Sequence, residues 1–156
     1  MKFQEEIILL NKTFLFILGA VVIAGLWLIA ADISDEGWIV IVALLFPLLF
    51  GRLVITVENN TLKINYGYID LIKKEIPLSE IKEIRVLEYS PIRQFGGWGI
   101  RCGKFEGEKT ACYNLKGNKG LLLILSKKVR VCCMKTDRVI VGCEGAEALK
   151  EAIKSG

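Results

Sequence analysis

Apolar residues gather in two runs near the start of the chain. The first run covers residues 13–31, and the second lies within residues 37–52, where it contains Pro47 and is followed by Arg52. The first run is close to the roughly 20 apolar residues that a helix needs to cross a hydrocarbon core. Only a short acidic segment separates the runs, so together they predict a two-helix transmembrane hairpin. A signal peptide ending near Ala31 and a soluble helical hairpin are the alternatives.

The charges that flank the two runs predict an orientation. The turn between them contains Asp32, Asp35 and Glu36 but no Lys or Arg, whereas basic residues flank the outer ends. Lys and Arg favour the cytoplasmic side of a membrane protein. We therefore expect a protein of the cell membrane with both termini cytoplasmic, in which residues 1–12 form a cytoplasmic N-terminal segment.

After the second run, the pattern changes to the alternation that is typical of β-strands. Residues 54–66 predict a hairpin that turns at Asn59 and Asn60, and three short, mainly apolar strands are expected within residues 121–143. The segment 145–154 has helical spacing instead and predicts an amphipathic helix. Its apolar residues share one helical face: Ala146, Leu149, Ala152 and Ile153.

Sequential antiparallel strands bury one face and leave edges that must be protected. A closed or half-closed barrel covered by the final helix meets both needs. The fold class that we expect is a membrane α-helical hairpin plus an α+β domain. That domain, residues 53–156, is a cytoplasmic, mainly antiparallel β-barrel that follows the second helix without a linker.

Four segments follow one another after the expected membrane helices: "FGGWGIR" (95–101), "YNLKGNKGLLLIL" (113–125), "RVIVGC" (138–143) and "EALKEAI" (147–153). In this order they resemble a family of bacterial and archaeal membrane proteins with a pleckstrin-homology-like (PH-like) domain. The resemblance implies a partly open barrel with a C-terminal capping helix, and it implies little about activity. Residues 121–143 are longer than this resemblance leads us to expect, as if a strand or a long hairpin were inserted.

The glycine-rich segment around Trp98 has two interpretations. Glycines allow sharp bends, and a tryptophan in such a corner can fill the space that they leave. The alternative is a ligand groove or a membrane interface, in which Arg93 and Arg101 contact anions. The corner interpretation predicts that Trp98 is buried.

The sequence contains few signs of a catalytic or metal-binding site. The chain has no histidine, which excludes a His-based triad and His acid–base catalysis. Its five cysteines include no Cys-x-x-Cys pair, and we expect them to be reduced thiols that fill space in the core. We therefore predict no enzyme activity, no catalytic or metal-binding residue, and no cofactor.

Residues 53–156 contain 18 Lys and Arg against 12 Asp and Glu. A basic domain beside an anionic leaflet is favoured electrostatically. Solvated hairpin tips are the alternative explanation, and nucleic-acid binding is not expected because exposed aromatics are not interleaved with the basic residues. The candidate contacts with a membrane surface are Lys73, Lys74, Lys127, Lys128 and Arg130.

Two functions remain open on these grounds. The first is a non-catalytic, membrane-anchored interaction or scaffold module that binds a protein partner or self-associates at the cytoplasmic face. The second is a lipid-surface reader that uses its basic hairpin tips on anionic head groups. The first is favoured because two membrane helices would already supply anchoring. The expected partners are the lipid bilayer and either a protein partner or a second copy of the chain.

Overall fold

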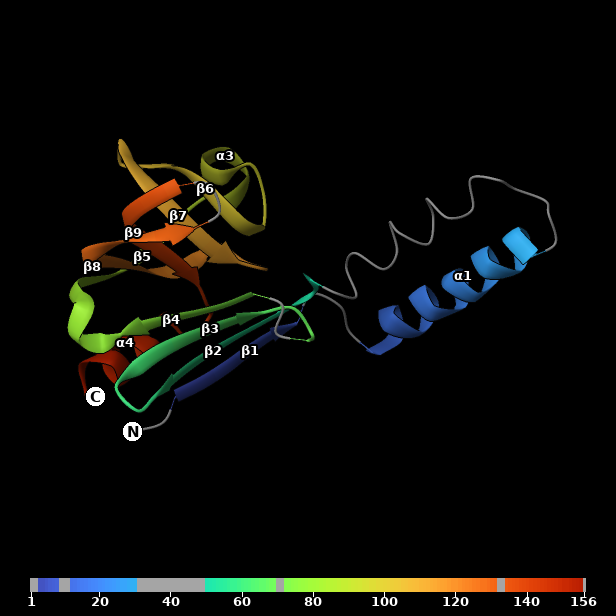
Figure 1. The fold of residues 1–156 in the computed structure, drawn as a ribbon, viewed down its shortest axis with the longest axis horizontal. Helices are drawn as coiled ribbons and strands as arrows, with labels where there is room; N and C mark the ends of the chain where they lie inside the picture. The colour runs from blue at the N-terminus through green and yellow to red at the C-terminus, as the bar shows by residue number, and fades with distance from the viewer. Residues whose placement is uncertain (1–2, 9–11, 31–49, 70–71, 132–133, 156) are drawn as a thin grey trace.

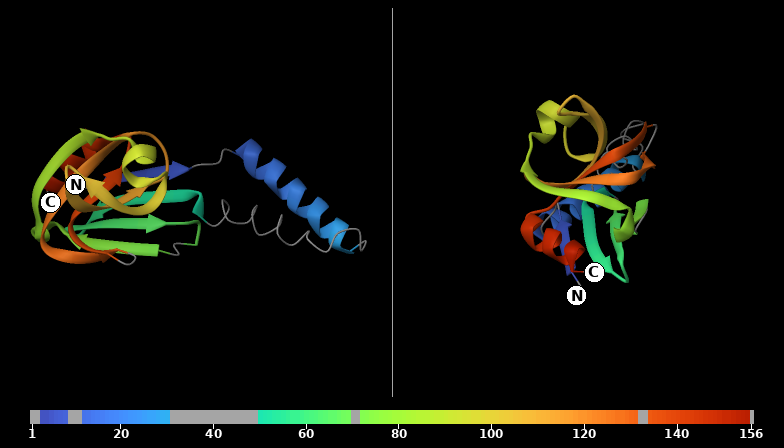
Figure 2. Two further views of the ribbon diagram at one scale, coloured as in Figure 1. Left: turned by 90° about the horizontal axis from the view of Figure 1, so that it is seen from above. Right: turned by 90° about the vertical axis from the view of Figure 1, so that its left-hand side faces the viewer.

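The computed structural model describes residues 3–8, 12–30, 50–69, 72–131 and 134–155. Two β-sheets form the body of the molecule, and helix α1 (Lys12–Ala30) projects from them in both Figure 1 and Figure 2. The first sheet has the strand order β1-β2-β3-β4, and the second has the order β5-β8-β9-β7-β6. Among the described strands, neighbours within each sheet pair antiparallel except β7 and β9, which are parallel.

The strands of the first sheet are β1 (Phe3–Ile8), β2 (Arg52–Glu58), β3 (Thr61–Tyr66) and β4 (Ile72–Pro77). The strands of the second sheet are β5 (Ile81–Glu88), β6 (Gly99–Phe105), β7 (Glu108–Asn114), β8 (Lys119–Val131) and β9 (Met134–Gly142). The remaining elements are the 3-10 helix η1 (Leu78–Glu80) and helices α3 (Pro91–Phe95) and α4 (Ala146–Lys154).

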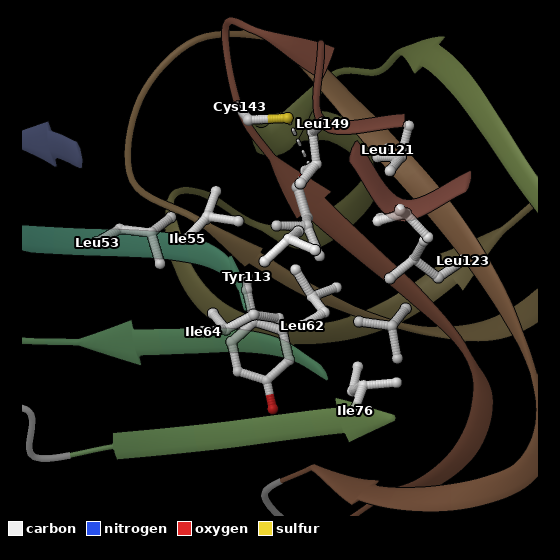
Figure 3. Packing of buried hydrophobic residues seen from close by; sticks show 14 of the residues in the cluster. Leu53, Ile55, Leu62, Ile64, Ile76, Tyr113, Leu121, Leu123, Cys143 and Leu149 are labelled. Atoms are coloured by element: carbon white, nitrogen blue, oxygen red, sulfur yellow. Dashed lines mark hydrogen bonds between the residues drawn. The ribbon is translucent and has the colours of Figure 1, made fainter. Parts of the chain in front are cut away.

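The main core lies between the two sheets and is closed at one side by α4. Every second residue of a strand points into this core. Strand β3, for example, buries Leu62, Ile64 and Tyr66, and the residues between them are partly exposed. Figure 3 shows Leu62 and Ile64 beside Tyr113 from β7, with Leu149 of α4 above them. Helix α4 packs against strands of both sheets, so its apolar face joins the two sheets into one core.

Strand β8 is buried on both faces in its first half, which explains why that stretch is wholly apolar. Leu121 and Leu123 face the main core, whereas Leu122 belongs to a second, smaller cluster with Tyr89 and Phe95. Helix α3 packs on β6 and covers this second face. The second sheet is therefore the middle layer of the domain.

Residues 3–8 belong to the first sheet, whereas the prediction assigned residues 1–12 to a separate N-terminal segment. Residues Phe3–Ile8 form strand β1, which pairs with β2 along its whole length, from Phe3 opposite Val57 to Ile8 opposite Arg52. Helix α1 is therefore inserted between two neighbouring strands of one sheet. The domain begins at residue 3, not at residue 53.

The predicted membrane hairpin and membrane localisation are corrected by the structure. Across the residues that it describes, no helix combines the length and the apolarity that a bilayer crossing requires. Most of the second expected helix, 37–52, lies outside those residues, and Arg52 already belongs to β2. The cytoplasmic placement of both termini depended on two membrane spans, so this prediction is withdrawn with them.

The region 121–143 contains one long hairpin and not three separate strands. Strand β8 runs through the expected gap at Lys127 and Lys128, and its pairing with β9 shifts register between Ile124 and Val129. The prediction failed because two adjacent lysines are typical of a loop. In a long strand with a bulge, however, both lysine side chains can lie in solvent.

Candidate interaction surfaces

The glycine-rich segment is a bend, and the aromatic side chain that it buries is Phe95. Helix α3 ends at Gly96, whose φ of 73° is left-handed, and Gly97 continues with a φ of 130°. Phe95 is buried, and its ring meets the ring of Tyr89 edge-on at a centroid distance of 6.0 Å. Trp98, in contrast, is 47% exposed. The expectation of a buried Trp98 is therefore wrong, and Phe95, three residues earlier, is the buried aromatic residue of this segment.

The three residues of the suggested ligand groove all lie at the surface. Arg93 is exposed on α3, and Arg101 is exposed on β6. The guanidinium Nε of Arg101 donates to the carbonyl oxygen of Trp98 at 3.1 Å, and the indole Nε1 of Trp98 donates to the carbonyl oxygen of Gly117 at 3.4 Å. The first contact lies within the bend, and the second joins the bend to the connection between β7 and β8.

The five basic residues expected at one membrane-facing surface fall into two groups. Lys73 and Lys74 lie at the start of β4 in the first sheet, whereas Lys127, Lys128 and Arg130 lie on β8 in the second sheet. Lys127 Nζ contacts Glu80 Oε1 at 3.2 Å, and Glu80 lies in η1 beyond the far end of β4. The two groups are thus separated by the length of a strand.

The cysteines that the structure describes are free thiols. Cys112 and Cys143 are buried, and burial raises the pKa of each to about 12. A thiol with such a pKa is a poor nucleophile, because the thiolate is the reactive form. Cys102 is partly buried, whereas Cys132 and Cys133 lie outside the described residues. The described part of the chain holds no group of three or more His, Cys, Asp or Glu side chains arranged for a metal.

Helix α1 exposes large apolar side chains. Phe16 is 80% exposed, Ile23 is 68% exposed and Trp27 is 66% exposed. Their spacings of seven and four residues place them on one side of the helix. Val21 and Leu26 are also exposed, so the apolar surface extends beyond this side. Large exposed apolar surfaces occur at protein–protein or membrane interaction sites and at ligand-binding grooves.

No protein-family model matches the chain, and neither the curated proteins nor the solved structures contain a match. The comparisons therefore leave the resemblance to PH-like membrane proteins untested. Function has to be argued from the residues of this chain.

Proposed function

We propose that this chain is a non-catalytic interaction module that self-associates through α1. The main observation in support is the exposed apolar side of this helix, formed by Phe16, Ile23 and Trp27. Full burial of such a side chain stabilises a complex by about 2 kcal/mol before the costs of association. No charged residue follows Lys12 within the helix, so the contact has no charge pattern that selects a different partner.

A second copy is the occupant that fits this surface best. A helix that is apolar on more than one side can pack against an identical helix, because a two-fold interface places the same patch on both subunits. Ala20 and Ala24 are also exposed and lie four residues apart, which leaves room for two helices to approach closely. The resulting dimer would carry two copies of the β-domain.

A non-catalytic role is supported by the side chains available. The chain contains no histidine, and within the described residues the buried thiols of Cys112 and Cys143 have raised pKa values. Histidine acid–base catalysis is therefore excluded, and the thiols of Cys112 and Cys143 are poor nucleophiles.

The test is the molar mass of the full chain in solution, measured by light scattering with and without a mild detergent. We expect a dimer or higher oligomer of the 17.4 kDa chain without detergent. The double variant Ile23→Ser/Trp27→Ser should be monomeric. The control Ile69→Ser/Ile92→Ser removes two similarly exposed apolar residues outside α1 and should leave the oligomer intact.

Two results would overturn the proposal. One is a chain that is monomeric at all concentrations without detergent. The other is an oligomer that survives Ile23→Ser/Trp27→Ser, because the contact would then lie elsewhere. Chemical crosslinking followed by mass spectrometry separates a second copy from a different protein, which would replace self-association by a heteromeric role.

A further inference from the structure

A basic pocket lies where the β6–β7 turn meets the β8–β9 hairpin. Its volume is about 340 Å³, which is within the range of small-molecule sites. Four lysines and two carboxylates line it, so its side chains carry a net charge of +2. The lining residues are Lys104, Gly107, Glu108, Lys109, Lys128, Lys135, Thr136 and Asp137.

Two pairs of like charges face each other across the strands that build this region. Lys104 of β6 lies directly opposite Lys109 of β7, and Arg130 of β8 lies directly opposite Lys135 of β9. Like charges in directly opposite positions destabilise a sheet. A local rule that is broken twice at one place is typical of a functional site.

Two nearby arginines, Arg85 and Arg138, share one carboxylate partner, whereas the pocket lysines have none within the described part of the chain. The Glu106 carboxylate accepts hydrogen bonds from Arg85 at 2.5 Å and from Arg138 at 2.9 Å, both through Nη2. These contacts lower the pKa of Glu106, the Arg85 hydrogen bond being the largest cause. Among the residues that the structure describes, no carboxylate lies within ion-pair distance of the four pocket lysines, which are Lys104, Lys109, Lys128 and Lys135.

The base of the pocket is rigid. The Thr136 hydroxyl is buried, donates to the carbonyl oxygen of Lys109 at 2.5 Å and accepts from the backbone N–H of Arg138 at 3.0 Å. This side chain joins the start of β9 to the start of β7, where the two strands have no backbone pairing of their own. The backbones that carry Lys109 and Lys135 are therefore held at a fixed separation.

We propose that this pocket binds a compact anion that carries phosphate groups. Four unpaired ammonium groups around a rigid base supply the charge, and lysine binds phosphate as a point charge. No aromatic residue lines the pocket, which argues against a nucleobase because bases need a stacking surface. Glu108 and Asp137 can accept hydrogen bonds from hydroxyl groups, so a phosphorylated polyol fits the lining better than a bare hydrophobic ligand.

Phosphate groups of this kind occur on free metabolites and on lipid head groups, and the experiment distinguishes the two. Isothermal titration calorimetry of the full chain with inorganic tripolyphosphate probes the free anion. Flotation with phosphatidylcholine vesicles, with and without about 5% phosphoinositide, probes the head group. Binding in the first assay, or phosphoinositide-dependent binding in the second, supports the site and identifies the source.

The decisive variant is Lys104→Gln/Lys135→Gln, which removes one lysine from each hairpin. We expect tripolyphosphate binding to weaken at least about tenfold, as expected when two charge-assisted contacts are lost. The control Lys82→Gln/Lys116→Gln removes the same charge from exposed positions outside the pocket and should stay within about twofold of wild type. Equal weakening in both variants would overturn the proposal, because it would show general charge attraction. Absence of binding in both assays would overturn it as well.

A second measurement, the melting temperature, begins without any ligand. In low-salt, phosphate-free buffer, Lys109→Gln should raise the melting temperature by a few degrees, because it removes the repulsion from Lys104. Addition of tripolyphosphate should then stabilise the wild type more than this variant. A lower melting temperature for Lys109→Gln would contradict the inferred repulsion.

Discussion

The carboxylate of Glu5 accepts hydrogen bonds from the backbone N–H of Glu144 at 2.8 Å and from that of Gly145 at 3.2 Å. These residues lie 139 and 140 positions away along the chain. Gly145 begins α4 and provides no side chain to cap it. Strand β1 therefore supplies the cap for the last helix, and the two ends of the described chain are joined by a charge placed at a helix N-terminus.

Glu5→Ala should cost about 1–2 kcal/mol of unfolding free energy, the usual value of an N-terminal cap. Glu5→Gln keeps one acceptor oxygen and should lose less. Gln4→Ala, on the exposed side of the same strand, is the control and should change stability by less than about 0.5 kcal/mol. Urea titration of the three variants checks this. Equal losses for Glu5→Ala and Gln4→Ala would mean that strand β1, and not the cap, accounts for the effect.

Local patterns were sufficient for part of the fold. The β2–β3 hairpin was predicted at the right place because Asn59 and Asn60 form its turn, with φ values of 51° and 58°. Such left-handed pairs favour Asn and Gly, so this signal is contained in two adjacent residues. The C-terminal helix was likewise expected within one residue of its start, from the spacing of its apolar residues.

Other features depend on contacts between distant segments. Strand β1 was missed because Glu5 interrupts its apolar alternation, and the reason for a charge on the inner side becomes visible only when Glu144 and Gly145 are in place. The parallel pairing of β7 with β9, such as Cys112 opposite Ile140, has no local signature either. Pairings of this kind follow from the packing of the whole domain.

The charged pocket could be predicted only in part. Lys128 was among the candidate residues, but Lys104 and Lys109 were not. A signal for Lys104 and Lys109 was present in the sequence. A two-residue turn at Glu106 and Gly107 places these two lysines opposite each other on β6 and β7. The approach of the β8–β9 hairpin, which completes the pocket, could not be inferred from the turn.

Gly142→Ala should destabilise the domain by about 3 kcal/mol. A Cβ at this position would lie 2.6 Å from the Tyr89 hydroxyl oxygen and 2.6 Å from Asn114 Cβ, and Asn114 is itself fully buried. Overpacking of a rigid interior costs about 1–3 kcal/mol and sometimes more. Gly19→Ala is the control, because an added Cβ there meets nothing within 4 Å. Denaturant titration that finds the two variants alike would contradict the close packing of Tyr89 on Gly142.

Phe95→Ala and Trp98→Ala should have unequal effects, although the two aromatic residues are only three positions apart. Phe95 is 6% exposed in the smaller core cluster, and its loss should cost about 3–5 kcal/mol. Trp98 is half exposed and makes one long hydrogen bond, so its loss should cost about 1 kcal/mol or less. Urea titration of both variants measures the difference. A larger loss for Trp98→Ala would restore the view that the indole fills the bend.

Stability should fall as the pH rises above about 9. Burial is the main cause that raises the pKa of Cys112 and of Cys143 from 9.0 to about 12 in the folded chain. Unfolded thiols lose their protons near their ordinary pKa, while the folded thiols keep theirs. The stabilisation is therefore complete below about pH 9 and is lost progressively toward about pH 12.

Urea titrations under reducing conditions at about pH 8, 9 and 10 test this pH dependence. In Cys112→Ala/Cys143→Ala, the decline should begin about one pH unit higher, because the next buried groups are Tyr66 and Tyr89, whose ordinary pKa is 10.0. Burial is the main cause that raises both, the pKa of Tyr66 to about 12 and that of Tyr89 further. The variant will be less stable at every pH because it leaves cavities, so the slope against pH, and not the absolute value, is the quantity to compare. Parallel slopes for wild type and variant would show that the two thiols do not control alkaline stability.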